Sequence, residues 1–250
     1  MGCIIAMAGK GGTGKTTVAS LIIRGIKEAG AGSLLAIDAD PNSNLGEVLG
    51  VEPGRNIGAI LDEISSNPGA VPSGMTKERF IEYQIQSAIQ EEDGFDILSM
   101  GRPEGPGCYC YVNNVLRSVI SGLIRDYDFV IIDNEAGLEH LSRRTSRCAD
   151  ILIVVSDGSR IGLKSAGRIN ELAIQLKFEV KKRFILLNRV KGCKGEPQVR
   201  ETGLEYLGCL PADPLIEKLS LNGESIFNLR NNAPVLAALN TLGERIWKCS

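Results

Sequence analysis

The 250-residue sequence lacks the segments that mark secreted and membrane-spanning proteins. No apolar run approaches the ~20 residues that a membrane-spanning helix needs. The first residues also lack the basic flank and the cleavage site of a secretory signal. Gly2 matches the start of a myristoylation motif, but Ala6 stands where that motif needs Ser or Thr. The sequence therefore predicts a cytoplasmic protein with no membrane attachment.

An excess of charge of one sign is also absent. The chain has 28 basic and 30 acidic side chains, which gives a formal net charge of −2. Such a balance provides no general attraction to nucleic acid or to anionic lipid, so we expect neither as a partner. No linker, internal repeat or low-complexity tract divides the chain, and we therefore expect one domain over residues 1–250.

Histidine is almost absent, and the number of cysteines is odd. The single histidine, His140, is of the kind that more often makes structural hydrogen bonds than binds a metal. Seven cysteines without a secretory context predict a reducing compartment and no disulfides, so closely spaced cysteines point to metal or redox chemistry. Cys108 and Cys110 form such a pair, whereas Cys209 is expected to be a small core residue.

Short apolar runs alternate along the chain with amphipathic stretches. The apolar runs predict strands at residues 3–8, 33–37, 95–99, 129–132, 151–155, 183–187 and 206–210. The amphipathic stretches predict helices at residues 16–29, 77–91, 112–125, 161–176, 197–204 and 235–247. Residues 50–74, rich in Gly, Pro and Ser, are expected to cross the surface between two helical pieces. This alternation predicts an α/β fold with a doubly wound, mostly parallel sheet and helices on both faces.

A phosphate-binding loop of the Walker A type follows the first predicted strand and opens the first predicted helix. Glycines allow backbone N–H groups to surround phosphate oxygens, and a helix N-terminus adds a partial positive charge. Lys15 is expected to reach the β- and γ-phosphates, and the Thr16 hydroxyl to bind Mg²⁺. The nucleotide-binding residues expected here are Gly9, Gly11, Gly12, Thr13, Gly14, Lys15, Thr16 and Thr17.

A second lysine, Lys10, lies near the start of this loop. The loop thereby resembles that of the deviant Walker A ATPases, the group that holds MinD, ParA and the nitrogenase iron protein, and the resemblance covers nearly the whole chain. It implies a P-loop NTPase that forms nucleotide-gated homodimers, in which Lys10 reaches the nucleotide of the facing subunit. It also implies Mg²⁺-dependent hydrolysis of ATP to ADP and phosphate, with catalytic roles for Lys10, Lys15 and Asp40.

Acidic residues follow two of the predicted strands. Asp38 and Asp40 lie at the carboxyl end of the second strand, the edge at which such sheets bind ligands. Asp133 ends the apolar strand 129–132 and fits the Walker B role. The resemblance implies that Asp38 supports Mg²⁺ through water, that Asp40 orients the attacking water, and that residues 135–139 sense the γ-phosphate. The Asp-x-Asp-Pro pattern of residues 38–41 is also common in turns that cap a helix.

The nucleotide base can be inferred from a missing acid. GTP-binding relatives read guanine with the pattern Asn-Lys-x-Asp, whereas this chain has Asn-Arg-Val-Lys at residues 188–191. Asn188 is able to pair with an adenine edge, but Lys191 cannot accept hydrogen bonds from guanine. We therefore expect ATP and ADP as ligands, with the backbone from Pro211 to Asp213 as a wall of the base site.

Cys108 and Cys110 lie in a loop rich in Gly and Pro. Residues two apart in an extended chain share a face, with Cα atoms ~7 Å apart, which strains a disulfide but suits two thiolates on one soft metal. Two ligands are too few for a stable site. A two-fold dimer axis through the loop would supply four thiolates, two from each subunit, for nickel or zinc.

The surroundings of this pair narrow the family resemblance. Residues 103–108 resemble the segment that holds the first cluster cysteine of the nitrogenase iron protein, but no cysteine after Asp133 matches that family's second one. Residues 107–110 together with 133–140 resemble CooC-type ATPases, accessory proteins that insert nickel into carbon monoxide dehydrogenase. This implies a nickel metallochaperone whose client is that enzyme. The alternatives are an acetyl-CoA synthase maturation factor, an iron–sulfur reductase and a ParA/MinD-like positioning ATPase.

Overall fold

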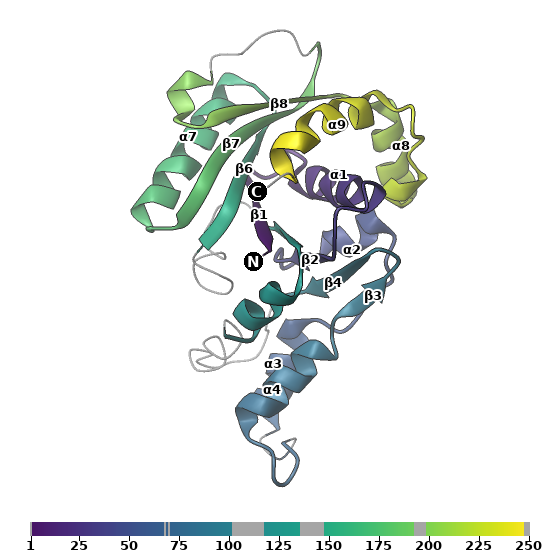
Figure 1. Cartoon of the computed structure of the whole chain (residues 1–250), viewed down its shortest axis with the longest axis vertical. Helices are drawn as coiled ribbons and strands as arrows, with labels where there is room; N and C mark the ends of the chain where they lie inside the picture. The colour runs from purple at the N-terminus through teal and green to yellow at the C-terminus, as the bar shows by residue number, and fades with distance from the viewer. Residues whose placement is uncertain are drawn as a thin grey trace.

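The computed structural model describes residues 2–67, 69, 71–101, 118–135, 148–192 and 199–247. These residues form an eight-stranded sheet in the order β3-β4-β2-β5-β1-β6-β7-β8 (Figure 1). Neighbouring strands are parallel, except that β3 runs antiparallel to β4. The strands are β1 (Cys3–Gly9), β2 (Leu34–Asp38), β3 (Gln90–Glu92), β4 (Phe95–Ser99), β5 (Phe129–Asp133), β6 (Cys148–Ser156), β7 (Glu179–Val190) and β8 (Glu205–Pro211).

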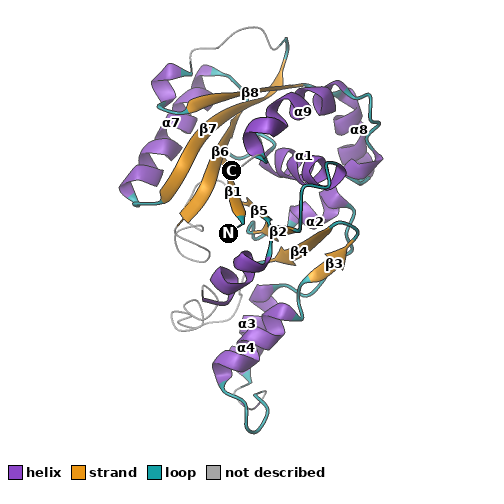
Figure 2. Cartoon of the chain, viewed as in Figure 1, coloured by secondary structure: helices purple, strands orange, loops and turns teal. Residues whose placement is uncertain are grey.

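Helices connect these strands (Figure 2). The α-helices are α1 (Lys15–Glu28), α2 (Asn44–Leu49), α3 (Ile57–Ser66), α4 (Lys77–Gln86), α7 (Arg160–Gln175), α8 (Pro214–Asn222) and α9 (Pro234–Ile246). Residues 118–123 are also helical. Short 3₁₀ segments among the described residues include η2 (Ile124–Asp126), η3 (Arg200–Thr202) and η4 (Ile226–Asn228).

Both faces of the sheet are covered, as the alternating side chains of β1 illustrate. Ile5 and Met7 point into one core, which also receives apolar side chains of α1, α2 and α9. Ala6 and Ala8 point into the opposite core, formed with α3, α4, α7 and residues 118–124. Because successive side chains of a strand face opposite sides, a strand buried on both faces must be apolar throughout. The predicted fold class, a mostly parallel sheet with helices on both faces, is confirmed.

Several predicted elements were wrong. Residues 50–74 contain α3, whose buried side chains include Ile57, Ile60 and Ile64, and the side chain of Asn56 caps it by accepting from the Ala59 N–H at 2.9 Å. The helix predicted over 77–91 ends earlier, because its last residues enter the edge strand β3. Among the described residues of the predicted helix 197–204, only the three of η3 are helical.

The predicted C-terminal helix is present as α9. Its buried residues include Leu236, Leu239, Leu242 and Ile246, which join the core on the α1 side. Its apolar stripe is therefore part of the core. Within the described ranges, no helix has the length and apolar character required to cross a membrane.

Cys209 meets one of the two expectations from the sequence, that it packs in the core, and not the other, that the chain has no disulfides. It packs, partly buried, against the core on the α7 side, as predicted for a core residue. It is also disulfide-bonded, which contradicts the prediction that the chain has no disulfides. The odd number of cysteines gave no sign of this bond.

Candidate nucleotide-binding site

The predicted phosphate-binding loop connects β1 to α1 at the carboxyl edge of the sheet. Gly9 and Gly14 have φ angles of 149° and 86°, in the region that side chains disfavour. A Cβ atom at Gly9 would lie 2.5 Å from the Val155 carbonyl oxygen, and one at Gly14 would lie 2.5 Å from Nδ2 of Asn188. The loop is therefore pressed against the ends of β6 and β7, and glycine is needed at both positions.

The two lysines of the loop lie in different environments. Lys15 is buried, with its Nζ 3.5 Å from the main-chain oxygen of Lys10, so its ammonium turns back over the loop. The same oxygen accepts a hydrogen bond of 2.9 Å from the Thr13 hydroxyl. The Lys10 side chain itself is exposed. Hydrogen bonds from Ser159 lower the pKa of nearby Asp157, and the charge of Lys10 adds a smaller effect in the same direction. One lysine thus lines the loop, and the other stands at the surface.

Two buried carboxylates lie side by side next to the loop, because Asp38 and Asp133 pair in the register of β2 and β5. Asp38 accepts hydrogen bonds from the N–H groups of Asp40 (3.1 Å) and Leu45 (2.8 Å), yet burial raises its pKa to about 6. Burial likewise raises the pKa of Asp133 to about 7, although a hydrogen bond from the Thr16 hydroxyl opposes this shift.

The donor set of this cluster fits a hard cation. Oδ1 of Asp133 has no hydrogen-bond partner although it is buried, and the neighbouring Asp38 carboxylate raises the pKa of Asp133 further. Carboxylate and hydroxyl oxygens are the ligands that Mg²⁺ prefers. Asp40 is only half-buried, and its Oδ1 accepts from the N–H and the amide of Asn42 at 2.9 and 3.0 Å. The structure thus brings Thr16, Asp38, Asp40 and Asp133 to one place.

Main-chain hydrogen bonds tie the ends of the neighbouring strands together. The Ala39 N–H donates to the carbonyl oxygen of Asp133, and the Met100 N–H donates to that of Asp38, both at 2.8 Å.

The segments that follow β4 and β5 continue into residues 102–117 and 136–147, which lie outside the described residues. The predicted metal ligands Cys108 and Cys110, the switch residues 136–139 and His140 fall there. Within the described residues, no three His, Cys, Asp or Glu side chains form a group that could hold a metal ion by themselves, and this includes the acids at the loop.

The residues predicted to bind adenine lie at the same edge. Asn188 is buried in the last part of β7, where its Nδ2 donates to the Thr13 carbonyl oxygen (3.0 Å) and its Oδ1 accepts from the Arg189 N–H (3.0 Å). Pro211 ends β8 opposite Val190. Asp213 caps α8 by accepting from the Leu215 N–H at 3.0 Å, and its Oδ2 is buried without a partner. Asn188 therefore also holds the phosphate-binding loop, a contact that sequence reasoning missed.

Sequence reasoning also missed Asn134, which follows Asp133. Its buried Nδ2 donates to the main-chain oxygens of Met7 (2.8 Å) and Ile132 (3.3 Å), which fixes the orientation of the amide. In the described part of the chain, five buried side-chain atoms lack hydrogen-bond partners, and four of them lie at or after the carboxyl ends of strands: Ser43 Oγ, Asp133 Oδ1, Asn134 Oδ1 and Asp213 Oδ2. Such a concentration of unpaired polar atoms is typical of a ligand site.

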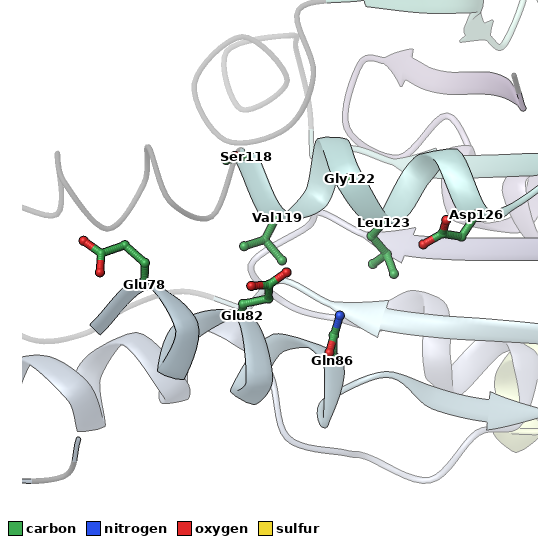
Figure 3. Close-up of a pocket in the computed structure, with 8 residues that line it drawn as sticks. All are labelled: Glu78, Glu82, Gln86, Ser118, Val119, Gly122, Leu123 and Asp126. Carbon is green, nitrogen blue, oxygen red and sulfur yellow. The ribbon is translucent and has the colours of Figure 1, made fainter. Parts of the chain in front are cut away.

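A cavity of about 230 Å³ opens beside the start of α1. Thr17 lines it from α1, Val48 from α2, and Ile216 and Leu219 from α8. A second cavity, of about 430 Å³, lies between α4 and residues 118–126 (Figure 3). In that view Glu78, Glu82 and Gln86 come from α4, and Glu82 and Gln86 point toward the helix that carries Val119, Leu123 and Asp126. None of its lining residues belongs to the phosphate-binding loop, so it is separate from the candidate site.

Relatives of known sequence match almost the whole chain. An uncharacterised ATP-binding protein of Methanocaldococcus jannaschii is 42% identical over 97% of this chain and 98% of its own length. The carbon monoxide dehydrogenase accessory protein CooC of Rhodospirillum rubrum is 29% identical over 89% of this chain and 89% of its own.

Solved structures share the fold. The cell division ATPase MinD of Pyrococcus furiosus superimposes with a TM-score of 0.74 at 23% identity, over 100% of both chains. The septum site-determining protein MinD of Pyrococcus horikoshii, complexed with Mg-ADP, gives a TM-score of 0.69 at 22% identity, over 98% of this chain and 96% of that one. The model of the CobQ/CobB/MinD/ParA nucleotide-binding domain matches residues 4–226, and this chain therefore belongs to that family of ATP-binding ATPases.

Proposed function

We propose that the protein is a homodimeric, Mg²⁺-dependent ATPase that acts as a metallochaperone in nickel insertion into carbon monoxide dehydrogenase. The observation that carries this proposal is the hydrogen bond from Met100 to Asp38. It means that the segment bearing Cys108 and Cys110 begins directly beside the carboxylates of the nucleotide site. The nucleotide therefore binds next to the start of this segment, and we expect a change of nucleotide to alter metal binding by the cysteine pair.

The nucleotide chemistry follows from the side chains at the loop. Lys15 binds the β- and γ-phosphates, since its buried ammonium already turns over the loop. Thr16, Asp38 and Asp133 hold Mg²⁺, whose charge neutralises the phosphate oxygens when it is bound. Asp40 orients the attacking water. The raised pKa values and the unpaired oxygen of Asp133 support this assignment, as does the Mg-ADP bound to the Pyrococcus horikoshii relative.

Dimerisation is assigned to Lys10. Its side chain is exposed at the mouth of the loop, whereas Lys15 is buried within it. A lysine in this position is free to reach the phosphates of a second subunit, where it adds the charge that the transition state of phosphoryl transfer needs. We propose a dimer in which each Lys10 completes the site of the other subunit.

The cargo is assigned to Cys108 and Cys110. Two thiolates from each subunit supply four ligands, a number that suits zinc in a tetrahedral site or nickel in a square-planar one. The similarity to CooC from Rhodospirillum rubrum supports carbon monoxide dehydrogenase as the client. A maturation factor for acetyl-CoA synthase would use the same arrangement with another client. A [4Fe–4S] reductase would use the same four cysteines, and a MinD-like positioning ATPase would need neither of them.

Metal binding to the full chain tests this proposal. Purified protein loaded with nickel or zinc is expected to bind about one ion per dimer in the presence of ATP. The double substitution Cys108→Ala/Cys110→Ala should abolish that binding, whereas Cys3→Ala, at a buried core position of β1, should not. Equal stoichiometry in all three proteins contradicts the metal assignment. After anaerobic reconstitution with iron and sulfide, visible absorbance that depends on Cys108 and Cys110 would favour the reductase instead.

A further inference from the structure

The cavity of about 430 Å³ between α4 and residues 118–126 has the shape of a groove between two helices (Figure 3). On one side Glu78, Glu82 and Gln86 follow one another at a spacing of four residues, so they share one face of α4. On the other side the lining residues run from Ser118 to Asp126 at helical spacing. Each set spans two helical turns, or about 12 Å.

The floor of this groove is apolar. Val119 and Leu123 point toward α4 and are only partly buried, although they pack against the core on the α7 side (Figure 3). Gly122 lies between them in the sequence, and a Cβ atom there would meet nothing within 4 Å. The two helices therefore leave room for side chains of another molecule, and the volume lies within the range of about 300–1,000 Å³ that is usual for binding pockets.

The walls of the groove are acidic. Glu78 and Glu82 line it from α4, Asp126 lines it from the end of the opposite helix, and none of the described lining residues is basic. Glu82 and Asp126 are exposed, and neither makes a hydrogen bond or an ion pair through its side chain within the described ranges. Arg125 precedes Asp126 but does not line the groove.

The helices make these walls more negative than the side chains alone would. Asp126 lies at the C-terminal end of its helix, where main-chain carbonyl groups already carry partial negative charge. Glu78 and Glu82 repel each other at a spacing of four on α4. Each arrangement costs its helix some stability, and a bound cation would offset that cost. The groove thus combines an apolar floor with a negative potential.

Lysine and arginine match this combination, because their long aliphatic stems pack on apolar surface while their charged ends stay in water beside the acids. A metal ion does not, since these acids form no group that could hold one among the described residues. A single small cation would be held weakly by exposed carboxylates. We propose that the groove is a docking surface for a basic helix of a partner protein, whose lysine or arginine side chains lie over Leu123 and pair with Glu82 and Asp126.

This inference goes beyond the proposed function, and its test needs neither nucleotide nor metal. The probe is a helical peptide of about 16 residues, long enough to be partly helical alone, built from Ala, Leu and Lys with the lysines on one face. Its counterpart carries Glu in place of Lys. In calorimetric titrations of the full chain, only the Lys peptide should bind, and less tightly as salt is raised from about 0.05 to 0.5 M.

Variants of the two acids test whether the peptide binds at the groove. Glu82→Gln/Asp126→Asn should weaken binding of the Lys peptide about 3- to 20-fold, as the loss of two exposed ion pairs predicts. Glu217→Gln removes an exposed acid of α8, a helix that packs against the core on the α1 side, across the sheet from the groove. It should leave binding unchanged.

Gly122→Leu separates a shaped groove from attraction between opposite charges alone. The new side chain enters the open space beside Gly122 and fills the groove, while every carboxylate stays. Leucine favours a helix more than glycine does, so the variant should keep the circular dichroism of the wild type. It should weaken binding of the Lys peptide at least as much as the double variant does.

Unchanged binding in Gly122→Leu would overturn the inference, and so would equal binding of the Glu peptide or no binding of the Lys peptide to wild-type protein. Spermine serves as a small polyamine control. If spermine binds more tightly than the peptide and depends on the same acids, the groove is a polyamine site and the docking surface is contradicted.

Discussion

The main-chain N–H of Met100 donates a hydrogen bond of 2.8 Å to the carbonyl oxygen of Asp38. Met100 follows β4, whereas Asp38 ends β2 and carries a fully buried carboxylate. Because Ala39 in turn donates to Asp133, the chain segments that leave β2, β4 and β5 are joined at one edge of the sheet. We therefore expect a shift of the end of β2 on nucleotide binding to reach residue 101, after which the segment with the cysteine pair begins.

The exposure of Lys10 and the burial of Lys15 predict different defects. Lys10→Ala should bind ATP with nearly wild-type affinity, yet lose nucleotide-dependent dimerisation and about 100-fold or more in hydrolysis rate, because one charge on the transition state is missing. Lys15→Ala should fail to bind ATP. Calorimetry, light scattering and phosphate release measure the three properties. Lys164→Ala, an exposed lysine of α7, serves as the control, and a dimer formed by Lys10→Ala contradicts the proposed role.

Glycine substitutions in the loop should differ in cost. Gly12 and Gly14 both have positive φ, but a Cβ atom at Gly12 would meet nothing within 4 Å, whereas one at Gly14 would overlap Asn188. Gly12→Ala should lower the free energy of unfolding by about 1 kcal/mol, and Gly14→Ala by about 2–4 kcal/mol, because strain and overlap add. Urea unfolding of the nucleotide-free protein measures both. Equal losses would mean that the contact with Asn188 is unimportant.

The buried carboxylates predict a pH dependence of stability. The pKa of Asp133 rises from 3.8 to about 7, so the folded protein binds this proton more tightly than the unfolded chain. Its ionisation is therefore a cost to folding that is absent below pH 3.8 and complete above about pH 7. Asp133→Asn should raise the free energy of unfolding of the nucleotide-free protein at pH 8 by about 1–3 kcal/mol, and by less at pH 5.

Asp128 provides the control of opposite sign. Hydrogen bonds from the N–H and the hydroxyl of Ser33 (2.9 and 3.0 Å) lower its pKa, so its contribution to stability is present above its unfolded pKa and is lost as the pH falls. Asp128→Asn should therefore destabilise the protein at pH 8. A stability of Asp133→Asn below that of wild type at pH 8 would contradict the raised pKa of Asp133.

Arg24 holds α1 to the segment before α9. Its side chain is 2% exposed and donates to the carbonyl oxygens of Ile226 and Leu229, both at 2.8 Å. Arg24→Ala should cost about 3–5 kcal/mol in the free energy of unfolding, because buried carbonyl groups lose their donors. Arg55→Ala, which removes a 44% exposed partner of Glu63, should cost less than about 1 kcal/mol. Similar losses in the two variants would contradict this reading.

The parts of the fold that were predictable have strong local signals. The strands of the sheet centre are apolar on both faces, and the phosphate-binding loop has a fixed glycine spacing. The missed helix α3 has the helical spacing of Ile57, Ile60 and Ile64, but the surrounding Gly, Pro and Ser residues obscured it. The edge strand β3 is polar, and its best signal was the Asp93-Gly94 turn before β4, with Gly94 at a φ of 78°.

The candidate site was predictable in its residue types and not in its contacts. Acids at strand ends could be placed at the carboxyl edge, because parallel strands end together. The pairing of Asp38 with Asp133 depends on the strand order, which brings β2 beside β5 although the two residues lie 95 positions apart along the chain. This strand order is not visible in local sequence patterns. The contacts of Asn188 and Arg189 with the loop likewise join residues about 175 positions apart.

The central claim is that the state of the nucleotide controls the cysteine pair, and metal affinity measured in both nucleotide states tests it most directly. Because coupling is reciprocal, nickel should bind more tightly with a non-hydrolysable ATP analogue than with ADP, and nickel should tighten binding of the analogue by the same factor. Lys10→Ala should abolish both effects. Equal nickel affinity in the two nucleotide states, with Cys108 and Cys110 intact, would contradict the account.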